Sequence, residues 1–239
     1  MRIEDHYAEI LRRTGSSPMN LRHRGLTVVL KDRFYFDYKF QGRTTGGGGE
    51  SGPGRGRANG KSGGMSRGRV VDHQVQAWIK RALSREQKRK NPEKTKKHDK
   101  LHAFSRAFIE LTRRMRLRPI GTQVVVRNDA CDLATLVDAV FLDERNKVVL
   151  VELKCGFEGY LDKANARMKT PFVDVPNSPR YQHQLQLCFT RHMFRRTFPE
   201  FGQVNALIVR MTETGAHVTP IDQRIETKVK KLMEKGKPV

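Results

Sequence analysis

The sequence has few cysteines, few acidic side chains and no long apolar run, and each shortage excludes a class of protein. Its three cysteines, Cys131, Cys155 and Cys188, lie far apart and form no CxxC pair, which argues against a disulfide framework or a zinc knuckle. No apolar stretch reaches the roughly 18 residues of a membrane span, and the N-terminus lacks the apolar region of a signal peptide. We therefore expect a soluble protein of a reducing compartment, the nucleus or the cytoplasm, that is not secreted and has no membrane partner.

Acidic residues are outnumbered by basic ones. Lys and Arg total 47 against 25 Asp and Glu, which gives a formal net charge of +22. An excess of this size attracts polyanions through counterion release and long-range steering. Nucleic acid is the leading candidate partner, and 239 residues suffice for one well-buried α/β domain with additional segments.

Composition divides the chain into three parts. Residues 1–41 form an N-terminal arm, in which alternating β-branched, aromatic and polar residues over 26–40 predict a short hairpin. Residues 42–67 are rich in Gly, Ser and Arg and almost free of apolar side chains, so we expect a flexible linker. Residues 68–239 contain the remaining apolar periodicity and form the main domain.

The main domain has the element order of an α/β or α+β fold with a mixed central sheet flanked by helices. Helical spacing and strand-like apolar runs support this order. Helices are expected at 70–83, 100–115, 179–196 and from 222 onward, and strands at 122–127, 133–142, 148–154 and 205–211.

The segment "VDAVFLDERNKVVLVELKC", residues 137–155, places three charges inside two apolar runs. The polar "DERNK", 143–147, predicts a turn that pairs the two runs antiparallel. With an odd number of loop residues Asp138 faces Glu152, and strand alternation puts Lys154 on the same face. With an even number the register slips by one and Asp138 turns to the other face.

Two carboxylates this close repel each other unless a cation joins them. Hard oxygen ligands at an incomplete site suit Mg²⁺ or Mn²⁺, which can activate water and neutralise a phosphate. Lys154 can orient that water or stabilise the negative charge that develops on phosphorus. The alternative is an Asp/Glu/Lys ion-pair cluster without catalytic function.

Asp138 followed by Glu152-x-Lys154 resembles the motif of the PD-(D/E)XK nuclease superfamily. Two flanking motifs resemble its RecB-type branch, which includes phage and viral alkaline exonucleases: "GRVVDH", 68–73, and "YQHQLQLC", 181–188. The resemblance implies a restriction-endonuclease-like core. It also implies a metal-dependent deoxyribonuclease, an exonuclease in DNA recombination, repair or replication-end processing. A structure- or sequence-directed endonuclease and a non-catalytic nucleic-acid-binding protein remain alternatives.

The resemblance also implies roles for individual residues and for partners. DNA, as duplex ends or a single strand, is the implied substrate, and a homo-oligomer or a single-strand-annealing protein is the implied protein partner. Gln123 stands where an acidic residue is frequent in the family, and Cys188 replaces a Tyr. The implied Mg²⁺ or Mn²⁺ ligands are Asp138, Glu152, Asp72 and the backbone carbonyl of Leu153, and the implied catalytic residues are Asp138, Glu152, Lys154, Gln184 and Tyr181.

Other acidic residues have competing explanations. Asp72 opens a predicted helix, where capping favours Asp without any metal, and His73 is adjacent. Glu110, on the helix before the sheet, is either a further carboxylate of the site or a salt-bridged surface residue.

Overall fold

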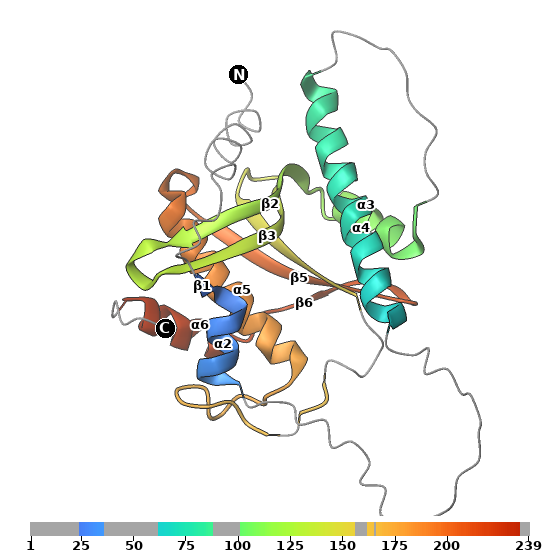
Figure 1. Cartoon of the computed structure of the whole chain (residues 1–239). Helices are drawn as coiled ribbons and strands as arrows, with labels where there is room; N and C mark the ends of the chain where they lie inside the picture. Colours follow the sequence, from blue (N-terminus) through green and yellow to red (C-terminus); the bar gives the residue numbers. More distant parts are fainter. Residues whose placement is uncertain (1–23, 36–61, 88–100, 156–161, 165, 235–239) are drawn as a thin grey trace, which may run out of the picture.

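The structure is a computed structural model that describes residues 24–35, 62–87, 101–155, 162–164 and 166–234. Its elements form one sheet with helices on both sides (Figure 1). In chain order they are β1 (Arg24–Gly25), α2 (Leu26–Phe34), α3 (Ser62–Gln87), α4 (Ala103–Arg114), β2 (Arg118–Asn128), η1 (Asp129–Cys131), β3 (Leu133–Leu142), β4 (Val148–Cys155), α5 (Pro179–Thr197), η2 (Pro199–Phe201), β5 (Val204–Thr212), β6 (Gly215–Thr219) and α6 (Gln223–Glu234).

The sheet contains six strands in the described part of the chain, in the order β1-β3-β4-β5-β6, and β2 also pairs with β3. β4 and β5 run parallel, as do β1 and β3, whereas the other pairs are antiparallel. The predicted mixed sheet flanked by helices is therefore confirmed. None of the helices that the structure describes is both long and apolar enough to cross a membrane.

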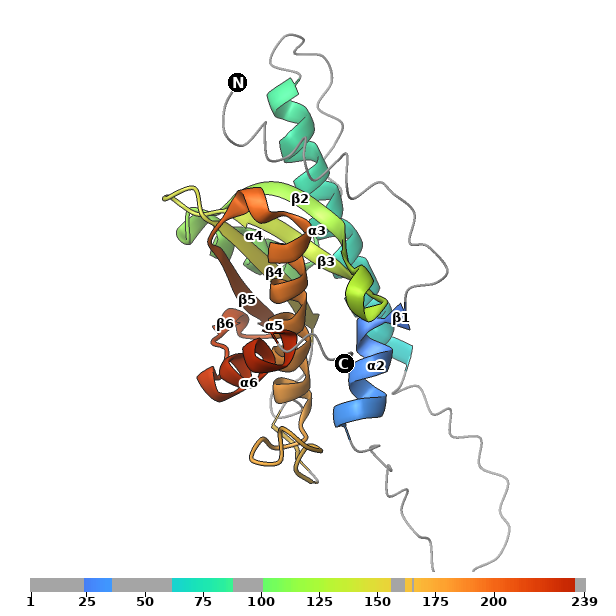
Figure 2. The same cartoon turned by 90° about the vertical axis from the view of Figure 1, so that its left-hand side faces the viewer.

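Each face of the sheet is covered by its own apolar core (Figures 1 and 2). The larger core joins α2, α5 and α6 to one face, and residues such as Leu150 and Ile208 point into it. The smaller core joins α3 and α4 to the other face through residues such as Phe141 and Val151. Successive side chains of a strand point to opposite faces, so residue numbers in β4 and β5 identify which helix layer a side chain meets.

Residues 26–34 form helix α2, so the prediction of a hairpin over 26–40 is wrong there. Leu26, Leu30 and Phe34 recur at helical spacing and are buried in the larger core. Burial of this stripe outweighs the strand propensity of the β-branched and aromatic residues around it. Residues 24–35 are thus part of the packed fold, whereas 1–23 and 36–41 lie outside the described residues.

Two other predicted boundaries differ from the structure. Helix α3 begins at Ser62 instead of Val70, so it includes the last residues of the predicted linker; the linker's residues 42–61 lie outside the described residues. Strand β6, Gly215–Thr219, was not predicted. It is short and half polar, and it follows β5 through a tight turn that Gly215 allows with a φ of 132°.

The predicted register of the β3–β4 hairpin is confirmed. The ladder runs from Leu142↔Val148 to Ala139↔Val151, so the next positions along it are Asp138 and Glu152. Asp143 closes the turn: its Oδ1 accepts hydrogen bonds from the backbone N–H groups of Arg145 and Lys147, at 2.9 and 2.8 Å. This side-chain acceptor holds the loop at the odd length that the register requires.

Strand β3 changes its buried face at Asp138. Val137 belongs to the larger core, whereas Ala139, two residues further, belongs to the smaller one. Opposite Asp138 on β2 lies Gln123, between the pairs Thr122↔Ala139 and Val124↔Val137, with a left-handed φ of 52°. A left-handed residue in the middle of a strand reorients the strand. This backbone conformation is strained for a residue other than glycine.

This strain predicts an unusual order of stability for substitutions at Gln123. Gln123→Gly is expected to raise the free energy of unfolding by about 0.5 kcal/mol, and Gln123→Val to lower it by about 1 kcal/mol or more. In a regular strand valine is favoured over glycine, so the order would reverse. Urea denaturation of the two variants measures the difference, and a valine variant more stable than the glycine variant would contradict a left-handed residue here.

Candidate active site

Asp138 lies where β3 and β4 separate. Beyond the Ala139↔Val151 pair, the backbone N–H of Leu153 donates a 2.8 Å hydrogen bond to Asp138 Oδ2. The carboxylate therefore points toward β4. It accepts the hydrogen bond that a backbone carbonyl of β3 would accept in a regular ladder. Thr122 Oγ1 donates to the Asp138 carbonyl at 2.8 Å and ties the same residue to β2.

Glu152 and Lys154 form an ion pair on the face of the sheet that α5 covers. Lys154 Nζ lies 2.7 Å from Glu152 Oε1, and the side chain of Glu152 is only 6% exposed. From α5, Gln186 Nε2 donates to the same oxygen at 3.3 Å. Glu152 and Lys154 are in contact, and Asp138 lies close enough for its charge to interact with both, although its carboxylate points toward the backbone of β4.

The pKa of Asp138 is raised to about 7. Burial is the largest cause, and the negative charge of Glu152 is the next; the Leu153 N–H and Lys154 act in the opposite direction. A carboxylate with a raised pKa is destabilised as an anion. A cation shared by the two carboxylates would remove that penalty.

Lys154 is an ammonium in this environment. Burial alone would lower its pKa, but the charge and hydrogen bond of Glu152, together with the charge of Asp138, reverse the effect and raise the pKa above its ordinary value. The side chain is 26% exposed, so the ammonium can meet a molecule that enters from solvent. The site therefore holds a permanent positive charge next to two acids.

Asp72 lies on α3 with its charge close to the same site. Burial is the main cause of the raised pKa values of Asp138 and Cys155, and the charge of Asp72 adds to both. Its Oδ2 accepts a 2.8 Å hydrogen bond from Gln76 Nε2, one turn along the helix. Because α3 begins at Ser62, Asp72 is inside the helix and capping does not explain it. His73, the next residue, is exposed.

Helix α5 contributes residues other than those expected. The amide oxygen of Gln184 accepts from the backbone N–H of Asp222 at 2.8 Å, so this side chain holds the start of α6 instead of approaching the carboxylates. Tyr181 packs against the larger core. Gln186 is the glutamine that contacts Glu152. The sequence offers both glutamines in "YQHQLQLC", and only the rotation of the helix against the sheet decides between them.

His183 lies one turn before Gln186 on the same side of α5. Burial, followed by the charge of Lys154, lowers the pKa of His183 to about 3, so the imidazole is neutral. Its buried Nδ1 has no hydrogen-bond partner among the residues that the structure describes. The isolated position of this histidine in the sequence gave no sign that it lies near the site.

The side chains leave a partial set of oxygen donors for a divalent cation. The hydrogen bonds and the ion pair described above use Asp138 Oδ2 and Glu152 Oε1. The second oxygen of each carboxylate takes part in none of these contacts. No cluster of three or more His, Cys, Asp or Glu side chains suited to a metal occurs in the described ranges. Two carboxylates fit Mg²⁺, which keeps several waters and shares substrate oxygens, better than a metal that needs a full protein cage.

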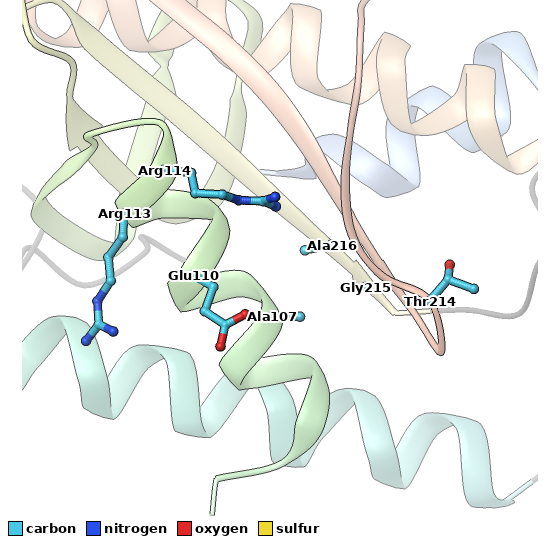
Figure 3. A pocket seen from close by; sticks show the side chains of 7 residues that line it. All are labelled: Ala107, Glu110, Arg113, Arg114, Thr214, Gly215 and Ala216. Atoms are coloured by element: carbon cyan, nitrogen blue, oxygen red, sulfur yellow. The ribbon is translucent and has the colours of Figure 1, made fainter.

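A hollow of about 520 Å³ lies on the other side of the sheet (Figure 3). Ala216 in its wall packs against the smaller core, which is the α3 and α4 side. Glu110 is exposed there, on the face of the sheet opposite to Glu152. The lining residues come from α4 and from the turn into β6: Ala107, Glu110, Arg113, Arg114, Thr214, Gly215 and Ala216.

Comparisons with protein-family models and with curated proteins find no match. Among solved structures, the chain is similar to one from Eubacterium rectale named "Putative exonuclease", at 13% identity and a TM-score of 0.36. This match covers 70% of the present chain and 63% of the other, so it spans less than two thirds of that protein. The chain is also similar to SSO0001, at 12% identity and a TM-score of 0.29, with 99% and 86% of the two chains covered. Similarities at these TM-scores do not define the chemistry of the site, which follows from the residues of the site itself.

Proposed function

We propose that the protein is a divalent-metal-dependent deoxyribonuclease. The observation that carries the proposal is the separation of β3 from β4, where Asp138 meets the Leu153 N–H beside the Glu152–Lys154 ion pair. The resemblance of these residues to the PD-(D/E)XK motif and the net charge of +22 support it. Within this class we favour an exonuclease that acts in recombination, repair or replication-end processing.

Asp138 and Glu152 would hold Mg²⁺ or Mn²⁺ through the oxygens that their present contacts leave over. The backbone carbonyl of Leu153 would assist, because the N–H and C=O of one strand residue point to the same side and the Leu153 N–H faces Asp138. Asp72 adds negative charge nearby. When bound, the metal would activate a water and neutralise charge on the scissile phosphate.

Lys154 would orient the attacking water or stabilise the charge that develops on phosphorus. Its ion pair with Glu152 fixes the position of Nζ, and Gln186 fixes Glu152 in turn. These contacts hold the ammonium in place before substrate arrives, which lowers the reorganisation needed during reaction. The neutral imidazole of His183 adds no competing charge beside Lys154.

The test compares cleavage of a linear DNA duplex with cleavage of a covalently closed circular duplex, each in Mg²⁺ and in EDTA. We expect products from the linear duplex alone, and only with Mg²⁺. Asp138→Asn protein, purified in the same way, controls for contaminating nucleases and is expected to be inactive.

Two other outcomes have defined meanings. Cleavage of both substrates would identify an endonuclease of the same chemistry. Salt-sensitive DNA binding with cleavage of neither substrate would overturn the proposal in favour of a non-catalytic nucleic-acid-binding protein.

A further inference from the structure

A row of three nitrogen-bearing side chains crosses the sheet, and its first member is the lysine of the ion pair. Lys154 of β4 pairs with Arg210 of β5, and Arg210 pairs with His217 of β6. Residues paired across neighbouring strands share a face, and the strands lie about 4.8 Å apart. The row therefore starts at the candidate active site and extends roughly 10 Å to the edge of the sheet.

Arg210 and His217 lie on the same face of the sheet as Glu152. Ile208, two residues before Arg210, is buried in the larger core on the α5 side, and Gln186 of α5 contacts Glu152 on that side. His217 is exposed, and its Nε2 lies 3.3 Å from Thr214 Oγ1. Neither β5 nor β6 contains an acidic residue.

This arrangement suits a phosphodiester backbone. Arginine keeps its charge and matches the oxygens of a phosphate with two parallel N–H donors, and histidine can add another donor. Arg210 lies one strand further from Glu152 than Lys154 does, so it is displaced from the scissile phosphate toward its neighbour along a bound strand.

We infer that Arg210 and His217 form a phosphate subsite that holds the DNA strand by the phosphate next to the scissile one. The strand would then cross β5 and leave over the β6 edge. This inference rests on the proposed nuclease function, because Lys154 marks the position of the scissile phosphate. The inference assigns to the bound strand a path across the sheet, from Lys154 toward β6.

The test measures binding of the full-length protein to a labelled DNA duplex with a single-stranded end, in EDTA, at a series of KCl concentrations. Loss of one phosphate contact reduces the slope of log K against log[salt] by about 0.7 to 0.9. We expect this reduction for Arg210→Gln, a smaller one for His217→Gln, and the wild-type slope for Arg210→Lys, which keeps the charge.

Arg195→Gln is the matched control. Arg195 is an exposed arginine about 14 Å further along α5 than Gln186, so its removal should leave the slope unchanged. If Arg210→Gln keeps the wild-type slope, the subsite does not exist. If Arg210→Lys loses as much slope as Arg210→Gln, the guanidinium supports the fold and the inference is also overturned.

Cleavage separates this inference from the proposed function. A wild-type protein that shows the Arg210-dependent slope but never cuts DNA in Mg²⁺ would retain the phosphate contact and refute the nuclease. A protein that cuts DNA, with kcat and KM unaffected by Arg210→Gln, would retain the nuclease and refute the subsite. If the protein is a nuclease and the subsite exists, Arg210→Gln raises KM and leaves kcat nearly unchanged, because the substitution weakens substrate binding without affecting the chemical step.

Discussion

Lys154→Met is expected to reduce Mg²⁺-dependent cleavage of linear DNA by about 10²–10³-fold, the usual effect of removing one stabiliser of developing charge. The methionine keeps the apolar length of the side chain and removes the ammonium that contacts Glu152 at 2.7 Å. Because the loss concerns a charge needed in the transition state, kcat should fall while KM changes little. Single-turnover cleavage of a labelled duplex measures the effect.

Two further variants make the result interpretable. Removal of Lys154 leaves Glu152 buried without its ion-pair partner, which can destabilise the fold. The double variant Glu152→Gln/Lys154→Met has no unpaired charge at these two positions, and we expect it to fold and to be inactive. Lys230→Met, at a lysine 65% exposed on α6, should cleave like the wild type. Wild-type cleavage by the folded double variant would remove the basis of the proposed mechanism.

Leu30→Ala is expected to lower the free energy of unfolding by about 2–5 kcal/mol. Leu30 is fully buried in the larger core although it belongs to a short helix near the N-terminus. The substitution removes apolar surface and leaves a cavity against α5 and the sheet. Urea denaturation followed by circular dichroism gives the change.

Val28 supplies the control from the same helix. It is 61% exposed, so Val28→Ala should change the stability by no more than about 0.5 kcal/mol. Equal and small effects at both positions would show that residues 24–35 are a separate arm, as the sequence had suggested. A large effect at Leu30 alone shows that they belong to the folded core.

The central hairpin was predictable from its pattern, although its register still depended on whether the loop has an odd or an even number of residues. Two apolar runs flank a polar turn, and the side-chain period of two then dictates which residues pair. Asp143 contributes a local turn signal that needs no tertiary information. Helix α2 was mistaken because Val28, Val29 and the following aromatic residues favour strands, whereas the helix is stabilised by contacts with distant elements.

The details of the site depended on information that a sequence does not carry. The change of buried face at Asp138 accompanies a left-handed Gln123, a conformation that glutamine rarely adopts. The choice between Gln184 and Gln186 depends on how α5 is rotated over the sheet, and both glutamines occur in one motif. Pairing of Arg210 with Lys154 required the parallel register of β4 and β5, which are separated by a long connection.

Binding of Mn²⁺ tests the central claim most directly. Electron paramagnetic resonance reports free Mn²⁺ while the protein is added together with a short DNA duplex, and the same DNA without protein gives the background. The wild type should remove Mn²⁺ from solution with saturation, and Asp138→Asn/Glu152→Gln protein should not. If the wild type does not bind Mn²⁺, or if the double variant binds it equally well, there is no metal site between Asp138 and Glu152.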